Sequence, residues 1–440
     1  MARYLLPISA LLLGSALLQY AGGIHSLILP VRGSDEGFSA TSLGLLGTGW
    51  AVGYVLGCFY TPRMVGLVGH IRAFSVVCAF AAVAILLQAI LVSPQAWIPV
   101  RAVSGFCFAG AAMIVESWLN DRAQPRTRGT IFGFYSMINL GAVTAGQLVI
   151  PLGDTTGFFF FALGAIFYAL ALVPTAISTS QSPAPLTTVH LDVGALWRNS
   201  PVAVVAVFLV GISNASFGTL AAVYADRVGL ALGSVALFAS LPVLAGALAQ
   251  VPIGLASDRL DRRWVLVATA VLALSADLAF IVLQPHGMPL NLALAGVFGA
   301  AIFAMYPIIV AHANDHAPPG TSIQVSGGLL MVFGVGSIIG PLIAGAAMNS
   351  LGPRGLFLTT ISAHVLIIAF TVWRIGRRAA VADDEKGHFQ VTMPARASTP
   401  ETAALASGED EDGDLEPAPT PPAADERSPT PQAGDDPPAG

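Results

Sequence analysis

The sequence predicts an all-α polytopic membrane protein with twelve transmembrane helices in two six-helix bundles, followed by a disordered C-terminal tail. Only 10% of the 440 residues are charged, 55% are apolar, and the mean hydropathy is +0.74. A soluble domain has about 25% charged residues. In hydrocarbon, backbone polar groups must be paired internally, so apolar runs of about 20 residues have to be helices. The run Leu163–Val173 lacks the alternation of a barrel strand.

Twelve such runs follow one another along the chain. The first begins close to Met1 and continues past the length of a signal-peptide core without a small-residue cleavage site, so we expect it to be retained as a helix. The expected spans are Leu5–Leu29, Thr41–Tyr60, Ala73–Val92, Trp97–Leu119, Thr130–Ile150, Gly157–Ile177, Pro201–Tyr224, Ser234–Ala256, Val265–Leu283, Leu290–Ala311, Ile323–Met348 and Gly355–Trp373.

A polar stretch rich in Ser, Thr and Pro divides these spans six and six. We therefore expect an N-terminal six-helix bundle at 1–178, a central loop at 179–200, a C-terminal six-helix bundle at 201–376 and an acidic, Pro-rich tail at 377–440. The tail has too few apolar residues to order itself, so it is expected to be solvated. A partner that orders it is the alternative.

Basic residues set the expected orientation, because loops on the cytoplasmic side carry the excess of Lys and Arg. With Met1 inside, the outer loops hold only Arg32, Arg227 and Arg354. Both termini and the central loop are then cytoplasmic, and the protein is expected in the plasma (inner) membrane. The cytoplasmic side holds Arg3, Arg63, Arg72, Arg122, Arg126, Arg128, Arg198, Arg259, Arg262, Arg263, Arg374, Arg377 and Arg378.

Cysteine usage points to no metal or redox chemistry. Cys58, Cys78 and Cys107 lie in or near apolar spans without metal-ligand spacing, which is typical of buried structural thiols. We expect no metal and no cofactor. The expected partners are the lipid bilayer and a small-molecule substrate, with protons as the candidate coupling ion, no nucleic acid, and a monomeric chain.

The loop between the eighth and ninth spans has the strongest local signal. It reads Gly254-Leu-Ala-Ser-Asp258-Arg259-Leu-Asp261-Arg262-Arg263 and could be only a solvated turn. The spacing resembles the G-x-x-x-D-R-x-G-R-R motif of the major facilitator superfamily (MFS), with Asp261 for the family's Gly. In that family the loop forms a charge cluster that latches neighbouring helices in one state of the transport cycle, so gating roles are expected for Asp258, Arg259, Arg262 and Arg263.

The first half carries a partial copy of this loop. Gly69-His-Ile-Arg72 resembles the basic end of the motif, but Gly66 stands at the Asp position. In the fourth span, Arg101-Ala-Val-Ser104-Gly105 resembles the family's R-x-x-Q-G motif. Arg101 either faces the cavity or extends its side chain to the membrane interface beside Trp97.

Glu116, near the end of the fourth span, needs a partner. It lies fifteen positions, about 22 Å, beyond Arg101, so the two cannot pair. Arg122, Arg126 or Arg128 could pair with it, and a gate network of Glu116, Arg122 and Arg72 with the loop charges is expected. The string Glu116-Ser-Trp-Leu-Asn120 resembles the YcaD-like subgroup of the superfamily, and this resemblance extends over nearly all of the membrane region.

Small residues predict close helix packing. Gly105 in the fourth span and Gly336, Gly340 and Pro341 in the eleventh are assigned to packing or bending. The fifth span lacks the Gly-Pro pair that drug-exporting members carry, which weakens a drug-antiporter interpretation.

Polar residues within spans predict the substrate path. The resemblance implies that spans one, four, seven and ten line the cavity. The inventory is mostly amide and aromatic, which suits a neutral or zwitterionic solute. The cavity candidates are Gln19, His25, Arg101, Asn139, Gln147, Asn214, Gln250 and Tyr306.

Asp277 is the one carboxylate deep within a span, which makes it a functional candidate, although the fold implied by the resemblance puts the ninth span at the periphery. The function predicted for the whole chain is alternating-access secondary transport of a small organic solute, coupled to protons. The alternatives are an efflux antiporter, a membrane-embedded enzyme using His312 and His316, and a transporter-like sensor.

Overall fold

The computed structural model describes residues 8–123, 125–177, 192–318, 320–377, 381, 386–387, 389, 395 and 398–402, with backbone alone at 125–128. Within these residues, 12 helices are long and apolar enough to cross a membrane. This confirms the predicted fold class.

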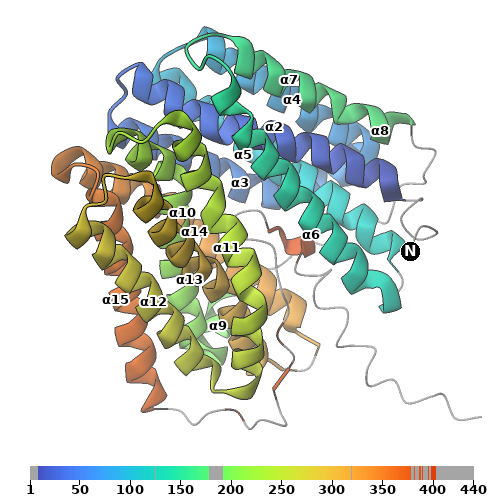
Figure 1. Ribbon diagram of the computed structural model, residues 1–440. Helices are drawn as coiled ribbons and strands as arrows, with labels where there is room; N and C mark the ends of the chain where they lie inside the picture. Colours follow the sequence, from blue (N-terminus) through green and yellow to red (C-terminus); the bar gives the residue numbers. More distant parts are fainter. Residues whose placement is uncertain are drawn as a thin grey trace, which may run out of the picture.

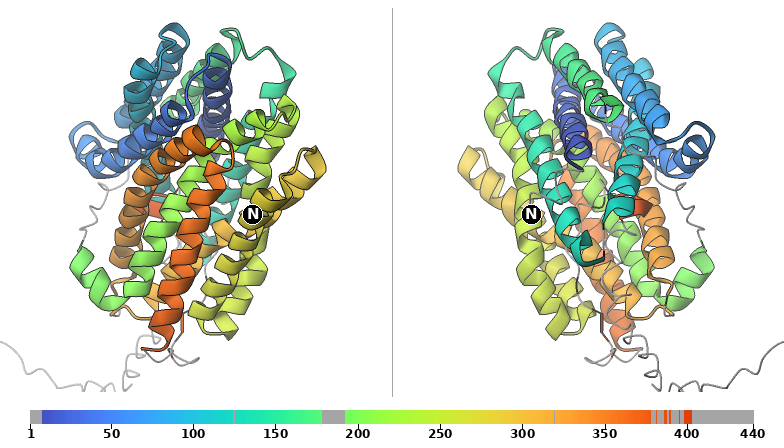
Figure 2. Two further views of the ribbon diagram at one scale, coloured as in Figure 1. Left: turned by 90° about the vertical axis from the view of Figure 1, so that its left-hand side faces the viewer. Right: turned by 90° about the vertical axis from the view of Figure 1, so that its right-hand side faces the viewer.

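Each half contributes six of the spans (Figures 1 and 2). The N-terminal bundle consists of α2 (Ser9–Asp35), α3 (Ala40–Val68), α4 (His70–Ile90), α5 (Pro94–Arg122), α6 (Pro125–Leu148) and the paired segments α7 (Phe159–Leu170) and α8 (Leu172–Ile177). The C-terminal bundle consists of α10 (Pro201–Arg227), α11 (Leu232–Arg259), α12 (Arg262–Leu283), α13 (Met288–Asn314), α14 (Ser322–Leu351) and α15 (Gly355–Ile375).

Local sequence explains where several helices begin. Serine side chains accept hydrogen bonds from backbone N–H groups at the starts of α3, α5 and α10, and proline follows the capping serine in the last two. Such caps satisfy N–H groups that have no partner inside the helix. Gly69, at φ 81°, separates α3 from α4 in a conformation that favours glycine.

Several helices extend beyond the expected apolar spans. α3 continues to Val68, eight residues past the expected end at Tyr60, and Pro62 lies inside it. The expected sixth span is divided into α7 and α8 at Ala171. Hydropathy locates the hydrocarbon-crossing part, whereas the helical hydrogen bonds of α3 continue until Gly69 ends the helix.

The two bundles repeat the same packing scheme. In the first, α2 packs on α6, α3 on α5, and α4 on α7; in the second, α10 packs on α14, α11 on α13, and α12 on α15. Glycine permits the close approaches, since an added Cβ at Gly23 would lie 2.2 Å from the Val143 carbonyl oxygen and one at Gly211 2.3 Å from that of Phe333. The halves are therefore structural repeats.

The bundles meet at one end. We call the end at which α2 begins and α15 ends the termini end, and the opposite end the far end. Near the far end a Cβ at Gly44 would lie 2.2 Å from the Pro341 carbonyl oxygen, and Ser34 donates a 2.6 Å hydrogen bond to Asp226. Toward the termini end the bundles diverge (Figures 1 and 2).

Two polar segments differ from expectation. Part of the central loop forms a short helix, α9 (Val193–Asn199), whose Leu196 is buried against Gly328. In the tail, residues 398–402 lie between the bundles instead of in solvent, as the red segment in Figure 1 shows. Residues 178–191 and 403–440 lie outside the described residues.

Candidate functional site

A cavity of about 210 Å³ lies between the two bundles. The N-terminal bundle contributes α2, α3, α5, α6 and α7, and the C-terminal bundle contributes α10, α11 and α13. A chamber formed by both halves changes shape when the halves move relative to each other, as alternating access requires. Its polar lining residues are Gln19, Ser26, Arg101, Ser104, Ser136, Asn139, Thr144, Gln147, Tyr168, Asn214, Thr219 and Ser240.

The structure brings five of the eight cavity candidates together in this lining: Gln19, Arg101, Asn139, Gln147 and Asn214.

The other three candidates lie elsewhere. His25 is buried with its Nε2 2.6 Å from Gln88 Oε1, and Gln250 is buried on α11. The Tyr306 ring packs edge-on against Phe333. Hydropathy could not show which side of each helix these residues occupy.

Arg101 faces the cavity, which decides between its two interpretations. It is the only charged side chain among the lining residues, and within the described part of the chain it makes no ion pair. A guanidinium presents a planar fork of donors that matches a carboxylate. The cavity therefore carries an unmatched positive charge.

Two amide side chains that line the cavity, one from each bundle, have an atom without a hydrogen-bond partner. Asn139 accepts a 2.8 Å hydrogen bond from Ser15 at Oδ1, which leaves its Nδ2 donor without a partner. Asn214 directs Nδ2 toward the Ile302 carbonyl oxygen, and its Oδ1 acceptor is unpaired. A buried polar atom without a partner is costly, so a ligand that pairs with both would gain affinity.

Aromatic rings form the apolar wall of the cavity. Trp50, Phe108 and Phe303 line it, and Trp50 packs against Phe108 at 5.8 Å between ring centroids. Sequence analysis missed these residues, together with Ser136 and Thr219. A helical spacing of three or four from Asn139 would have pointed to Ser136, Val143 and Gln147 on one face of α6.

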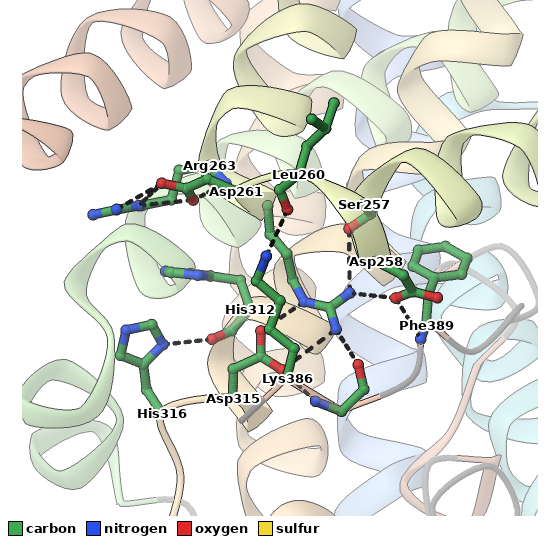
Figure 3. A network of polar contacts seen from close by, with 12 residues as sticks. Ser257, Asp258, Leu260, Asp261, Arg263, His312, Asp315, His316, Lys386 and Phe389 are labelled. Carbon is green, nitrogen blue, oxygen red and sulfur yellow. Dashed lines mark hydrogen bonds and ion pairs between the residues drawn. The ribbon is translucent and has the colours of Figure 1, made fainter. Parts of the chain in front are cut away.

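At the termini end, Arg262 is the centre of a charge cluster. Its guanidinium bonds to Asp315 at 2.6 Å from Nε and to Asp258 at 3.2 Å from Nη1, and its side chain is 1% exposed (Figure 3). Ser257 accepts a further bond at 3.2 Å. The cluster joins the α11–α12 loop to the end of α13, so it stays within the C-terminal bundle.

The expected single gate network is therefore divided. Arg262 and Asp258 belong to the Asp315 cluster, whereas Glu116 lies in a separate buried group on α5. Arg72, Arg122 and Arg259 are partly or fully exposed and form no ion pair within the described residues. Sequence spacing could not reveal Asp315, which lies 53 residues from Arg262.

Arg263 pairs with its neighbour Asp261, at 2.7 Å from Nη2 to Oδ2. Partial burial would raise the pKa of Asp261, but hydrogen bonds from the Arg263 side chain and backbone outweigh burial and lower it. Asp261 also caps α12, which gives the replacement of the family's Gly a structural role. His316 Nδ1 bonds the His312 carbonyl oxygen at 2.9 Å, as in a polar helix end.

Glu116 has hydroxyl partners instead of the expected arginines. Tyr135 donates to Oε1 at 3.1 Å, and Thr402 to Oε2 at 2.8 Å; Thr399 also donates to Oε2. The carboxyl group is fully buried. Arg126 and Arg128 have side chains outside the described residues.

Tail residues thus fill the space between the bundles. The Tyr54 hydroxyl donates to the Ser398 carbonyl oxygen at 2.5 Å, and Tyr54 lies fourteen residues, about 21 Å, inside the termini end of α3. Closer to that end, Phe389 N donates to Asp258 at 2.9 Å and Arg262 bonds the Gly387 carbonyl oxygen (Figure 3). The tail lies on the termini-end side of the cavity.

The expected packing residues lie at close contacts between helices. An added Cβ at Gly105 would lie 2.0 Å from the Trp50 carbonyl oxygen, one at Gly336 2.1 Å from that of Phe208, and one at Gly340 2.4 Å from that of Ile212. Pro341 lies inside α14, and its carbonyl oxygen meets Gly44 of the other bundle.

Comparisons with known proteins agree with this architecture. The chain is 23% identical over 383 residues to "Uncharacterized MFS-type transporter YcaD" of Salmonella arizonae, covering 86% of this chain and 98% of that protein. It is 24% identical over 387 residues to "Uncharacterized MFS-type transporter Ent638_1421" of Enterobacter sp. strain 638, with the same coverage.

Solved structures share the fold. The nucleoside transporter NupG superposes with a TM-score of 0.69 at 15% identity, covering 84% of this chain and 98% of that one. A bacterial homologue of the human lysosomal transporter Spinster, in an inward-facing and occupied conformation, has a TM-score of 0.68 at 14% identity, covering 86% and 97%.

The family model described as Major Facilitator Superfamily matches residues 11–247 and 203–409, which together span most of the sequence. The match indicates a transporter rather than an enzyme. It also confirms the resemblance drawn from the charged loops and the Glu116 string. This chain belongs to the Major Facilitator Superfamily.

Proposed function

We propose that the protein is a secondary transporter that moves a small organic acid through the cavity between its bundles by alternating access. Arg101 carries this proposal, because it is the one charged side chain in a lining that offers no carboxylate to neutralise it. A solute with a carboxylate or a comparable anionic group would provide the counter-charge.

The rest of the lining narrows the class of solute. Asn139 offers a free donor and Asn214 a free acceptor from opposite bundles, so a hydroxyl or amide group on the solute could bridge them. Trp50, Phe108 and Phe303 favour an apolar or aromatic body. This refines the expectation of a neutral or zwitterionic solute toward one with a net negative charge.

The packing of the bundles supports alternating access. Contacts between the halves concentrate near the far end, at Gly44 and at the Ser34–Asp226 hydrogen bond, while the termini end diverges. With the termini end in the cytoplasm, as the basic residues predict, this is an inward-facing arrangement with the tail inserted. We propose this orientation, with both termini cytoplasmic, for the protein in the plasma membrane.

Thermal stabilisation of the purified protein tests the solute class. A ligand that binds the folded state raises stability by RT ln(1 + [L]/Kd), about 2.7 kcal/mol at 100 times Kd. We expect stabilisation by some members of a library of small hydroxy, keto and aromatic carboxylates, and none by their primary amides.

Two variants make this result specific to the cavity. Arg101→Gln should abolish the stabilisation, whereas Arg227→Gln, at an exposed position on α10, should retain it. Stabilisation by amides as strong as by acids, or full stabilisation of Arg101→Gln, would refute the assignment of an anionic solute.

A further inference from the structure

A second buried polar site lies outside the cavity. Asp277 on α12 bonds His364 of α15, with 2.7 Å between Oδ2 and Nδ1, and accepts a 2.7 Å bond from the Thr360 hydroxyl at Oδ1. His364 Nε2 lies 3.0 Å from the Ser213 hydroxyl on α10. All four side chains are at most 1% exposed. The site therefore connects three helices of the C-terminal bundle within the membrane.

The N-terminal bundle has a counterpart on its three equivalent helices. His25 on α2 contacts Gln88 of α4 at 2.6 Å and Tyr168 of α7 at 3.4 Å. The repeat scheme makes α2, α4 and α7 equivalent to α10, α12 and α15. In this half an amide replaces the carboxylate, so only the C-terminal site contains an acid.

Packing alone does not explain why this acid is in the membrane. A buried acid–imidazole pair contributes little net stability, because desolvation offsets the attraction, and apolar residues of similar volume would pack as well. An ionisable residue within a transmembrane helix is therefore a candidate for function. The N-terminal counterpart demonstrates that this packing position accepts a neutral amide.

Charge and space identify the ligand of the site. Without an added proton, Asp277 and neutral His364 together carry one negative charge; with one, the pair is neutral whether the proton is on the carboxylate or on the ring. Side chains at 0% exposure leave no room for a hydrated ion, and no group of three potential metal ligands occurs among the described residues. The ligand that fits is a proton.

The serine connects this site to the cavity. When His364 is neutral with hydrogen on Nδ1, its Nε2 accepts the Ser213 hydroxyl hydrogen. When the pair gains a proton, Nε2 carries hydrogen and donates to Ser213, whose own hydrogen must turn to another acceptor. Ser213 is adjacent in sequence to Asn214, which lines the cavity with an unpaired Oδ1. Protonation thereby changes hydrogen bonding on the helix that contributes to solute binding.

We propose that Asp277 and His364 form the proton-binding site that couples solute transport to a proton gradient, with Ser213 as the positioning residue between this site and the cavity. This rests on the proposed transport function. One proton bound with one monoanionic solute would make the transported load electrically neutral.

Other ionisable groups lie away from the pair. The helices packed around it are α10, α12, α13, α14 and α15, and α14 contains no ionisable side chain. Phe298 of α13 covers His364 with its ring at 6.0 Å between centroids. The remaining ionisable groups of these helices and their caps are Tyr224, Asp226, Arg227, Asp261, Arg262, Arg263, Tyr306, His312, Asp315, Arg354 and Arg374.

Nitrogen NMR of the full-length protein in nanodiscs, labelled with ¹⁵N at histidine, tests proton binding without any solute. Ring-nitrogen shifts distinguish the cation from each neutral tautomer, and His364→Gln assigns the His364 signals. We expect the His364 ring to change its protonation form or tautomer as the pH is lowered over the range in which the protein stays folded. In Asp277→Asn we expect His364 to remain neutral throughout, while His25, paired with Gln88, is the internal control.

The outcomes separate a coupling site from a structural pair. One protonation form of His364 across the whole range, or the same titration in Asp277→Asn, would overturn the proposal. If Asp277→Asn fails to fold, Ser213→Ala replaces it: loss of the hydroxyl partner at Nε2 shifts the midpoint of a titrating pair and leaves a non-titrating one unchanged.

A linkage measurement tests coupling to the solute. With the carboxylate that most stabilises the wild-type protein, apparent affinity should rise up to about tenfold per unit fall in pH if one proton binds with the solute. This dependence should vanish in Asp277→Asn while binding persists. If Asp277→Asn binds the solute with the same pH dependence as the wild type, the proposed coupling site is rejected, whereas the proposed transport function is not. Absence of any stabilising carboxylate would reject the proposed function instead, and the NMR titration would still stand.

Discussion

Glu116 offers a quantitative test of tail insertion. Substitution Glu116→Leu removes the acceptor of two tail hydroxyls, from Thr399 and Thr402, and replaces a buried acid with an apolar side chain. The fold should survive, because a buried carboxyl without a cation does not favour the folded state. The threonine hydroxyls still accept from the backbone N–H groups of Thr402 and Thr399, so the variant weakens the attachment of the tail; the Tyr135 hydroxyl also loses its acceptor.

The expected effect follows from the two lost bonds. A typical intramolecular hydrogen bond contributes about 0.5–1.5 kcal/mol net, so the two bonds contribute about 1–3 kcal/mol, or roughly a 5- to 150-fold change in the opening equilibrium. Hydrogen exchange followed by mass spectrometry reports this equilibrium for the segment 398–402. We expect exchange in this segment to be faster in Glu116→Leu than in the wild type, by a factor of roughly 5 to 150.

A matched control is available on the same helix. Asp121→Asn, at an exposed position near the end of α5, should leave exchange of the tail segment unchanged. Tail protection that is equal in Glu116→Leu and the wild type would refute the contribution of this carboxyl group. A wild-type tail that exchanges as fast as an unstructured peptide would refute insertion itself.

Two further substitutions test the closed far end and the charge cluster. In Gly44→Ala the added methyl group would lie 2.2 Å from a backbone oxygen of α14, so this substitution should separate the bundles at the far end. Distances between spin labels on α3 and α14 should then lengthen. Gly66→Ala, whose added methyl group would have no neighbour within 4 Å, should leave these distances unchanged. Arg262→Met leaves Asp315 buried without its cation and should lower the free energy of unfolding by about 3–5 kcal/mol. In denaturation experiments, the free energy of unfolding of Arg259→Met, at an exposed position, should stay within about 0.5 kcal/mol of the wild-type value. An equal loss of stability in Arg262→Met and Arg259→Met would contradict the role of the cluster.

The spans and the division into halves could be predicted because hydrocarbon imposes a length and a composition on each helix. The face of each helix was harder to predict. Five cavity candidates line the cavity, but His25, Gln250 and Tyr306 do not, because helices that are apolar all round carry little amphipathic signal. Arg101 could be assigned to the cavity only once α5 had neighbours.

Long-range pairing could not be predicted at all. Asp277 and His364 are 87 residues apart, and each looked like an isolated polar residue until α12 and α15 came together. The tail gave a misleading signal for the same reason. The composition of the tail predicts solvation, yet two of its threonines donate hydrogen bonds to the buried carboxyl of Glu116. Nothing in the sequence indicated that these residues would be partners.

Uptake into proteoliposomes tests the central claim most directly. The full-length protein, reconstituted with the carboxylate that gives the largest thermal stabilisation, should accumulate that solute above its external concentration when a proton gradient is imposed. Arg101→Gln should abolish accumulation, and Arg227→Gln should preserve it. Equal accumulation by Arg101→Gln, or no uptake of a solute that binds to the cavity, would contradict transport through this site.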